Sequence, residues 1–412
     1  MKLPKNLSKS EEQRYLAGIL PYNAALYEIR QAYILEGVYL NCNEMDRRMQ
    51  SYDAYKALPA KVAQKVLKQL HEAWISFFAA KAAYEEDPSK FTSRPQLPQY
   101  KHKTEGRNVL IYTMQAISGG ETGGKKTLQC GIIKPSKLPI EVQTQQDPKK
   151  IDQVRIVPRN GHYVVAVIYH KEPVQAQVDP LFCVAIDLGV TNLAAITSNR
   201  EGFVPRLVNG RTLKARNQWY NRRIKELKLC LPKEDRERVT KQMERITNKR
   251  NRQVKHDLHV ASKTVIDFLV KEGVGTIIVG KNPLWKQETN MGKRNNQNFV
   301  QIPHARFIDM LTYKAKLVGI QVEVQEESYT SKASFLDLDP IPTYKPGDGT
   351  EYTFSGKRIG RRNRLYRTKD GQVICADVNG SYNILRKSKP DAFKAEGIAA
   401  YVVQPSRLAI VV

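Results

Sequence analysis

The pattern of apolar runs between residues 181 and 325 constrains the fold of this chain more than any other feature of the sequence. It begins with the unbroken apolar run LFCVAIDLG at residues 181–189 and continues with NLAAITSN, PRLVNG, GTIIVG and IQVEVQ. A very basic stretch with helical character (211–270) and an amphipathic segment (303–318) separate the later runs. Continuous apolar strands that alternate with helices predict an α/β domain whose central strands are covered on both faces.

The order of these elements is three strands, a long helix, a strand, a helix and a strand, which is the order of a ribonuclease H-like sheet. Two other parts precede it. Residues 11–85 carry apolar side chains at helical spacing, and residues 109–178 carry short alternating runs separated by Gly, Asn and Pro. We therefore predict a multidomain α+β chain with a helical domain at residues 1–95, a β-rich domain at 96–178 and an α/β domain at 179–412.

The net charge indicates the kind of partner. The chain of 412 residues has 67 Lys and Arg against 41 Asp and Glu, a formal charge of +26, which excludes an ordinary neutral metabolic enzyme. Phosphate contacts release counterions and so favour the binding of a cationic surface to a polyanion. We expect a nucleic acid as the partner, in preference to a membrane surface or an acidic protein.

The cysteines indicate the compartment. They are odd in number, lie far apart and form no C-x-x-C pair: Cys42, Cys130, Cys183, Cys230 and Cys375. This pattern favours a reducing compartment and argues against a disulfide framework and against a four-cysteine zinc site. The N-terminal residues are polar, and no window approaches 18 consecutive apolar residues. We expect a cytoplasmic protein with no membrane partner.

Two aspartates stand where apolar runs end. Asp187 closes VAID, where a charge is costly unless it binds something, so it either caps a turn between strands or binds a metal. Asp377, in VICADVNGSYNILRK, precedes a predicted helix and is either an N-cap or a second ligand. Mg²⁺ prefers carboxylate oxygens and serves phosphate chemistry. Two such carboxylates favour a site for divalent metal.

These motifs, in this order, resemble one family. IDLGVTNLA, the basic segment ending NKRNRQVKHDLHVASKTVIDFLV, the segment from GTIIVGKNPLW to EVQEESYTSK, and ADVNGSYNILRK are similar to the RuvC-type nuclease half of TnpB. TnpB is the OrfB protein of bacterial insertion sequences and a relative of the type V CRISPR effectors. The likeness covers roughly residues 181–388. Upstream, LPAKVAQKVLKQLHEAWISFF and RPQLPQYKHK resemble the recognition helices and the wedge β-domain of the family.

The resemblance implies an RNA-guided DNA endonuclease of a bacterial or archaeal cell, associated with the nucleoid. A guide RNA bound by the protein pairs with double-stranded target DNA beside a short flanking motif, and a RuvC site with two Mg²⁺ ions cuts the DNA. The three predicted domains then correspond to a helical recognition lobe, a β-rich wedge domain and a RuvC-like nuclease domain. Asp187 matches the family's first catalytic acid and metal ligand, and Asp377 matches the third.

The family's second acid, a glutamate at the end of GTIIVG, is replaced by Gly280 in this chain. Glu326 and Glu327 end the run IQVEVQ, which we expect beside GTIIVG at a strand spacing of about 4.8 Å. In one interpretation one of them completes the metal site, with Glu327 preferred because it is closer to the turn. In the other, the protein is a nuclease-inactive RNA-guided DNA-binding repressor. Alternation along the strand is expected to send the side chains of Glu326 and Glu327 to opposite faces. Glu288 is a remoter candidate for the missing acid.

The resemblance also implies a zinc ribbon after the fifth strand. Its first cysteine position holds Ala333, and no other cysteine occurs before Cys375, so we predict no zinc. The insert that remains, about residues 334–372, carries a basic run that either forms a solvated hairpin or, as we prefer, follows the nucleic-acid backbone. The basic residues are Lys357, Arg358, Arg361, Arg362, Arg364, Arg367 and Lys369.

Further nucleic-acid contacts are expected in two places. The stretch 211–257 holds 16 Lys and Arg against six Asp and Glu, with Trp219, Tyr220, Arg222 and Arg223 at its start. Rings interleaved with guanidinium groups suit stacking on unpaired bases or binding a heteroduplex. Lys101 and Lys103, in the linker 87–103, are candidates for phosphate contact. The sequence leaves open the oligomeric state, the guide and flanking-motif sequences, a transposon or CRISPR association, and a transposase that joins strands.

Overall fold

A computed structural model describes residues 19–102, 106–117, 131–138, 140–159, 162–282, 297, 299–344, 350–360, 364–393, 398, 401 and 403–409. The chain divides into two compact units, Met1–Lys171 and Glu172–Val412. The predicted helical domain and most of the predicted β-rich domain fall in the first unit. Within the described residues, no helix is both long enough and apolar enough to cross a lipid bilayer.

The first unit begins with helices, as the apolar spacing predicts. They are α2 (Ile19–Gln31), a π-helix (Ala32–Glu36), α3 (Cys42–Met49), α4 (Asp53–Lys56) and α5 (Ala60–Glu86), followed by a 3₁₀ turn (Pro88–Lys90). Asn41 caps α3 by accepting hydrogen bonds from the backbone N–H groups of Asn43 and Glu44. Along α5, Val62, Val66, Leu67, Leu70 and Trp74 are buried, which confirms the helical period of this segment. Residues 11–18 lie outside the described residues.

The rest of the first unit is built from short strands. β1 (Leu110–Thr113), β4 (Ile151–Arg159) and β5 (His162–Tyr169) form an antiparallel sheet with β4 in the centre, and β2 (Ile132–Ile133) pairs with β3 (Val142–Gln143). Two 3₁₀ turns, Met114–Ala116 and Pro148–Lys150, connect them. Trp74 of α5, Tyr112 of β1 and Val154 of β4 lie in one hydrophobic cluster. The helices and the sheet of this unit therefore share one core.

The second unit contains a six-stranded sheet in the order β10-β9-β6-β7-β8-β14. The strands are β6 (Asp179–Leu188), β7 (Asn192–Ser198), β8 (Arg206–Asn209), β9 (Val274–Gly280), β10 (Gln321–Gln325) and β14 (Ser406–Arg407). β6, β9 and β10 are parallel, while β7 is antiparallel to both neighbours. The predicted neighbour relationship is confirmed, because β10 lies beside β9 and β9 lies beside the strand that carries Asp187.

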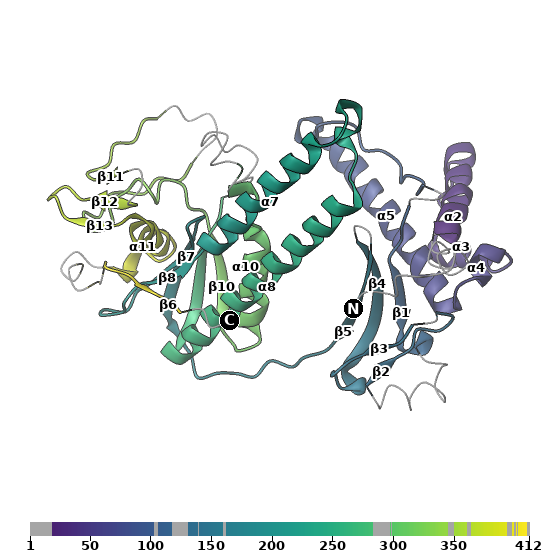
Figure 1. Cartoon of the computed structure of the whole chain (residues 1–412), viewed down its shortest axis with the longest axis horizontal. Coiled ribbons are helices and arrows are strands. Elements are labelled where there is room, and N and C mark those ends of the chain that lie inside the picture. Colours follow the sequence, from purple (N-terminus) through teal and green to yellow (C-terminus); the bar gives the residue numbers. More distant parts are fainter. Residues whose placement is uncertain are drawn as a thin grey trace. The chain divides into compact units, whose positions relative to one another are not determined.

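The basic segment between β8 and β9 forms two helices, so the prediction of one long helix was wrong. α7 (Arg211–Leu229) and α8 (Lys241–Glu272) lie side by side as a hairpin (Figure 1). Pro232 follows α7 and lacks the backbone N–H that a continuing helix needs. A 3₁₀ turn (Lys233–Glu237) and the capping side chain of Thr240, which accepts from the N–H of Met243, then start α8.

The side chains of β6 alternate between two helical layers. Val184 and Ile186 lie in the cluster formed with α8 and with α10 (His304–Lys316), whereas Cys183 and Ala185 pack against α11 (Ala376–Ser388). Figure 1 shows α11 on one side of the sheet and α8 and α10 on the other. Asp187 has the parity of Cys183 and Ala185, so it faces α11.

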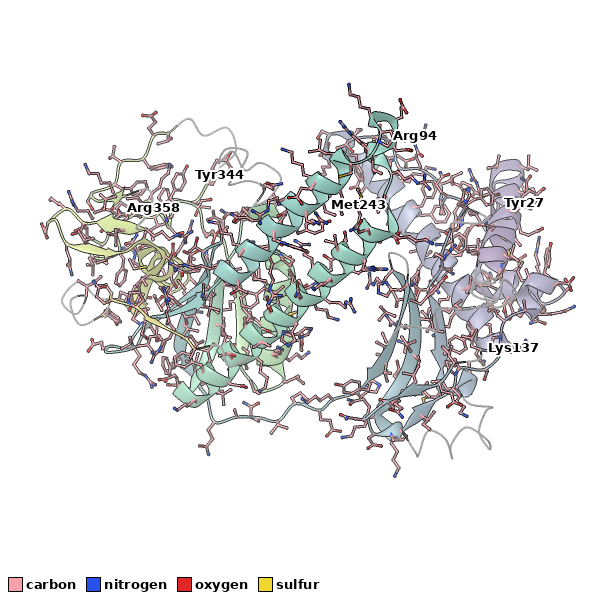
Figure 2. All side chains as sticks on the ribbon, viewed as in Figure 1. Tyr27, Arg94, Lys137, Met243, Tyr344 and Arg358 are labelled. Carbon is pink, nitrogen blue, oxygen red and sulfur yellow. The ribbon has the colours of Figure 1, made fainter. Side chains whose placement is uncertain are left out.

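The basic insert forms a small antiparallel sheet of β11 (Lys357–Ile359), β12 (Leu365–Arg367) and β13 (Val373–Cys375), next to α11 in sequence. Figure 2 labels Arg358 on β11. Arg361 and Arg362 lie outside the described residues, as do Glu288 and Lys103. A last 3₁₀ turn, Pro390–Ala392, follows α11.

Hydrogen bonds hold the insert where the family's zinc ribbon would stand. The carbonyl oxygen of Ala333 accepts hydrogen bonds from the side-chain amides of Asn379 (2.8 Å) and Asn383 (2.7 Å). The carboxylate of Asp339 accepts the backbone N–H groups of Ser334 (2.8 Å) and Ser355 (3.1 Å). Phe335 and Tyr382 stack with ring centroids 4.3 Å apart. Hydrogen bonds and ring stacking therefore hold the start of the insert against α11.

Candidate active site

Asp187 lies near the end of β6, with its carboxylate against α11. Gly380 of α11 is the point of contact, since a Cβ atom at this position would come within 3.0 Å of Oδ2 of Asp187. The hydroxyl of Ser381, the next residue, donates to the carbonyl oxygen of Ala185 at 3.0 Å and joins the same helix to the same strand. The small residues of α11 thus allow the helix to approach the carboxylate closely.

Glu327 fills the space above Gly280, the residue that ends β9. A Cβ atom on Gly280 would collide with Oε2 of Glu327 and would lie 2.5 Å from Cδ1 of Ile384. Glycine is therefore the residue at position 280 that leaves room for the Glu327 carboxylate. The resemblance places a glutamate at the end of β9. In this chain the carboxylate of Glu327, just after β10, lies there instead.

Asp377 occupies the first turn of α11 and is almost fully buried. Its Oδ2 accepts hydrogen bonds from Nη1 of Arg364 (2.8 Å) and from the side-chain amide of Asn192 (2.7 Å). Its Oδ1 lies 3.8 Å from Nη2 of Arg358. Arginine–carboxylate bonds of this kind are charge-assisted and stronger than neutral ones. Two basic residues of the insert therefore turn inward to Asp377.

The three carboxylates of Asp187, Glu327 and Asp377, hereafter the acidic cluster, interact electrostatically. Burial raises the pKa of Asp187 well above its ordinary value, and the charges of Glu327 and then Asp377 raise it further, whereas Arg358 and Arg364 act in the opposite direction. Burial, followed by the charge of Glu326, raises the pKa of Glu327 to about 7, and Lys387 opposes this. Like charges held together in a poorly solvated place favour the binding of a cation.

Glu326 points away from the acidic cluster. Its Oε2 forms an ion pair with Nζ of Lys387, and its Oε1 accepts the backbone N–H of Ser328 at 2.7 Å. Burial raises the pKa of Glu326, but the hydrogen bonds from Lys387 and Ser328 outweigh it, and the net pKa is lowered. Glu326 and Glu327 thus point in different directions, Glu326 to Lys387 of α11 and Glu327 over Gly280, although β10 itself ends at Gln325.

The donor chemistry of the acidic cluster fits a divalent metal ion. Mg²⁺ takes carboxylate oxygens, and Oε2 of Glu327 is buried without a hydrogen-bond partner in the described part of the chain. No group of three or more His, Cys, Asp and Glu side chains within the described ranges is already arranged to hold a metal. Asp377 instead contacts Arg364 and Asn192, so it would have to turn from Arg364 to join Asp187 and Glu327 around an ion.

Several residues of this site were not identified from the sequence. Asn192 begins β7 just after the IDLGVT segment, and Lys387 lies in the last turn of α11, so both stand inside motifs that the resemblance covers. Arg364 was expected to contact nucleic acid but contacts Asp377. His304, at the start of α10, lies with Nε2 3.1 Å from the carbonyl oxygen of Gly189, two residues after Asp187. Only the three-dimensional arrangement shows these contacts.

The predicted nucleic-acid contacts differ in their exposure. Trp219 is 45% exposed on α7 and Arg222 is exposed, so both are accessible. Tyr220 is occupied within the hairpin, with its hydroxyl 3.1 Å from that of Thr247 on α8. Arg223 pairs with Glu226 of its own helix at 2.9 Å.

Lys101 and the basic residues of β11 were also predicted to contact nucleic acid. Nζ of Lys101 lies 4.6 Å above the ring of Tyr22, and the Lys101 backbone exchanges two hydrogen bonds with the side chain of Asn23. Lys101 therefore has a structural role in the first unit. Lys357 and Arg358 are exposed on β11, and Arg358 also forms the ion pair with Asp377 described above.

Comparison with protein families gives two matches, which together lie between residues 163 and 384. The family model of the OrfB_IS605 probable transposase matches residues 163–285, and the model of the Cas12f1-like TNB domain matches residues 304–384. These stretches contain the motifs of Asp187 and Asp377. The chain is a TnpB-like relative of the type V effectors. Comparison of this TnpB-like chain with curated proteins found no match.

One solved structure, a Cas12f1 complex, has a fold similar to that of this chain. A Cas12f1–sgRNA–target DNA complex matches with 14% identity and a TM-score of 0.51, over 92% of this chain and 83% of that one. A CRISPR–Cas12f ternary complex matches with 14% identity and a TM-score of 0.34 (91% and 81% covered). Alicyclobacillus acidoterrestris C2c1 with single-guide RNA matches with 9% identity and a TM-score of 0.37 (92% and 70%). The first of these supports the mixed α/β multidomain architecture.

Proposed function

We propose that this protein is an RNA-guided DNA endonuclease whose second catalytic acid has moved from β9 to the end of β10. It binds a guide RNA, pairs it with double-stranded target DNA beside a short flanking motif, and cuts the DNA with two Mg²⁺ ions. One observation carries this proposal: the carboxylate of Glu327 fills the space above Gly280, and its charge raises the pKa of Asp187. The relocated acid makes the nuclease-inactive alternative unnecessary.

In this mechanism Asp187, Glu327 and Asp377 would hold the ions. Bound divalent ions supply an activated water and stabilise the leaving 3′ oxygen. The residues of the chain shape the site and orient the acids. Asp187 is partly buried with its carboxylate against α11, and Gly280 and Gly380 leave space for two of the three acids. Asn192 orients Asp377 through its hydrogen bond to Oδ2.

The nucleic acids are bound by the cationic surface. The +26 net charge supports this, as do the family matches and the single-guide RNA and target DNA named for the Cas12f1 complex. We assign backbone contacts to Lys357, Arg358 and Arg222 and base stacking to Trp219, all of them exposed. The recognition lobe (1–95) and the wedge domain (96–178) bind the guide and the flanking motif, and the insert needs no zinc. The protein acts in the cytoplasm on nucleoid DNA.

The test is plasmid cleavage with Mg²⁺. The protein is co-expressed with its flanking genomic RNA and given a target library with randomised neighbouring bases. Asp187→Ala, Glu327→Ala and Asp377→Ala should each abolish cutting while guided binding stays close to that of the parent. Glu326→Ala should still cut, because Glu326 faces Lys387.

Two outcomes would change the conclusion. If the parent binds its target but never cuts, the protein is a guided DNA-binding repressor. If Glu326→Ala is inactive and Glu327→Ala cuts, the second acid is Glu326. Products in which DNA ends are joined would indicate a transposase.

A further inference from the structure

Lys387 makes an unusually complete set of contacts at the end of α11. Its ammonium forms an ion pair with Glu326 and donates to the carbonyl oxygens of Ser328 (3.2 Å) and Pro342 (3.0 Å). Only 8% of its side chain is exposed. An ammonium group has three N–H donors, so each donor has an acceptor here. A buried lysine with three acceptors is costly to disturb.

Two of the three acceptors of Lys387 lie in the turn after β10. Glu326 and Ser328 flank Glu327 on either side, and Oε1 of Glu326 also accepts the N–H of Ser328. Through these contacts one ammonium group fixes both neighbours of Glu327. Within the described residues, Lys387 forms no hydrogen bond with the Glu327 carboxylate itself.

The backbone of Glu327 is held from two further directions. Its N–H donates to Oδ1 of Asn282, just past β9, at 2.9 Å. Its carbonyl oxygen accepts the hydroxyl of Thr330 at 2.8 Å. With the main chain held at these points, the side chain of Glu327 extends over Gly280 rather than into solvent.

We propose that Lys387 is a positioning residue that directs Glu327, and not Glu326, to the metal site. By binding Glu326 it withdraws the competing carboxylate and fixes the turn in which Glu327 faces Asp187. This inference rests on the proposed function, since it assumes that the acidic cluster binds metal. It explains how a chain with two consecutive glutamates presents only one of them to the cluster.

A second ion pair of the same kind provides a matched control. Lys389, two residues further along the chain, pairs with Glu323 of β10 at 3.2 Å, with 42% and 41% of the two side chains exposed. This pair also joins the end of α11 to β10 but does not involve the turn at residues 326–328. Loss of the Lys389 pair reports the general cost of breaking an ion pair between these elements.

The experiment measures Mn²⁺ binding to the purified full-length protein by electron paramagnetic resonance, beside plasmid cleavage and thermal unfolding. Lys387→Met should weaken Mn²⁺ binding on the order of 10-fold, the effect typical of residues that orient metal ligands. Lys389→Met should stay within about twofold of the parent, a ratio far smaller than the 10-fold loss expected for an orienting residue. Lys387→Arg, which keeps the charge and the donors, should recover much of the binding.

The outcomes distinguish a failure of the inference about Lys387 from a failure of the proposed function. If Lys387→Met lowers the unfolding temperature but leaves Mn²⁺ binding unchanged, Lys387 has only a structural role and the inference is wrong. If it fails to fold, Glu326→Gln decides, since it should bind Mn²⁺ like the parent while Glu327→Gln does not. Equal loss in both glutamine variants overturns the inference. If the parent's Mn²⁺ binding is indifferent to Asp187→Ala, the proposed function itself fails.

Discussion

Nη1 of Arg364 lies 2.8 Å from Oδ2 of Asp377, and the backbone of Arg364 has a left-handed φ of 50°. A residue with a Cβ atom adopts this conformation at a cost of about 1–2 kcal/mol. The ion pair and the strained backbone therefore occur in the same residue. The strain persists because β12 and the contact with Asp377 fix the side chain and the main chain together.

Arg364→Gly and Arg364→Ala test this strain. Both variants lose the ion pair with Asp377, but only glycine adopts a left-handed φ freely. The alanine variant should be less stable than the glycine variant by about 1 kcal/mol in urea unfolding. An alanine variant of equal or higher stability would contradict a strained backbone at this position.

Asp187→Asn should separate stability from activity. It removes a carboxylate whose charged form is disfavoured by burial and by the charges of Glu327 and Asp377, so the free energy of unfolding in EDTA should rise by about 1 kcal/mol. Cleavage should be lost and guided binding kept. The exposed Asp370 gives the control, because Asp370→Asn should change neither quantity. A destabilised Asp187→Asn protein would mean that the cluster is not under electrostatic strain.

Stability should fall as pH rises towards 7. Burial and the charge of Glu326 raise the pKa of Glu327 from 4.5 to about 7, so between these values the folded protein holds a proton that the unfolded chain has released. Folding then binds protons, and the free energy of unfolding decreases with rising pH in this window. Thermal unfolding in EDTA at pH 4.5–8 should show this decrease. Glu327→Gln should reduce this decrease but not abolish it, because the pKa of Asp187 is also raised, whereas Glu351→Gln, at an exposed position, should leave it unchanged.

The acid should be transferable back to β9. Gly280→Glu alone should be inactive or impaired, because its side chain collides with Glu327 and Ile384. Combining it with Glu327→Ala and Ile384→Val removes both obstacles, and the triple variant should regain plasmid cleavage that Glu327→Ala/Ile384→Val lacks. Ile384→Val by itself should cost only about 0.5–1.5 kcal/mol of stability. If the triple variant stays inactive although folded, Gly280 and Glu327 do not serve one site.

The salt dependence of target binding should reveal the phosphate contacts of β11. Lys357→Gln together with Arg358→Gln should reduce the slope of log K against log salt concentration by about 1–2, one unit for each lost contact. Lys271→Gln, at an exposed position on α8, should leave the slope unchanged. An unaltered slope in the double variant would remove β11 from the binding surface.

The sheet of the second unit was predictable because its signals are local. Continuous apolar runs identify β6 and β9 as central strands, and both are buried on two faces. The interruption between α7 and α8 also had a local signal, Pro232, but the strong helical character of the flanking segments obscured it. Asp187 and Asp377 could be identified because each ends an apolar run.

The choice between Glu326 and Glu327 was not decidable from the sequence. Alternation applies within a strand, and β10 ends at Gln325. Beyond it, side-chain direction depends on Lys387 and Asn282, which lie 61 and 45 positions from the glutamates they contact. Likewise, the basic run of the insert did not reveal that Arg364 would face Asp377, since one positive φ decides its direction.

The close approach of Glu327 to Gly280 also limits the evolutionary routes to this site. An ancestor with glutamates at both positions could not have kept both side chains in their present places, because a Cβ atom at position 280 already overlaps the Glu327 carboxylate. The acid therefore cannot have been duplicated and then lost without rearrangement. A sequence comparison of position 280 alone would therefore miss the carboxylate that Glu327 brings to the same place.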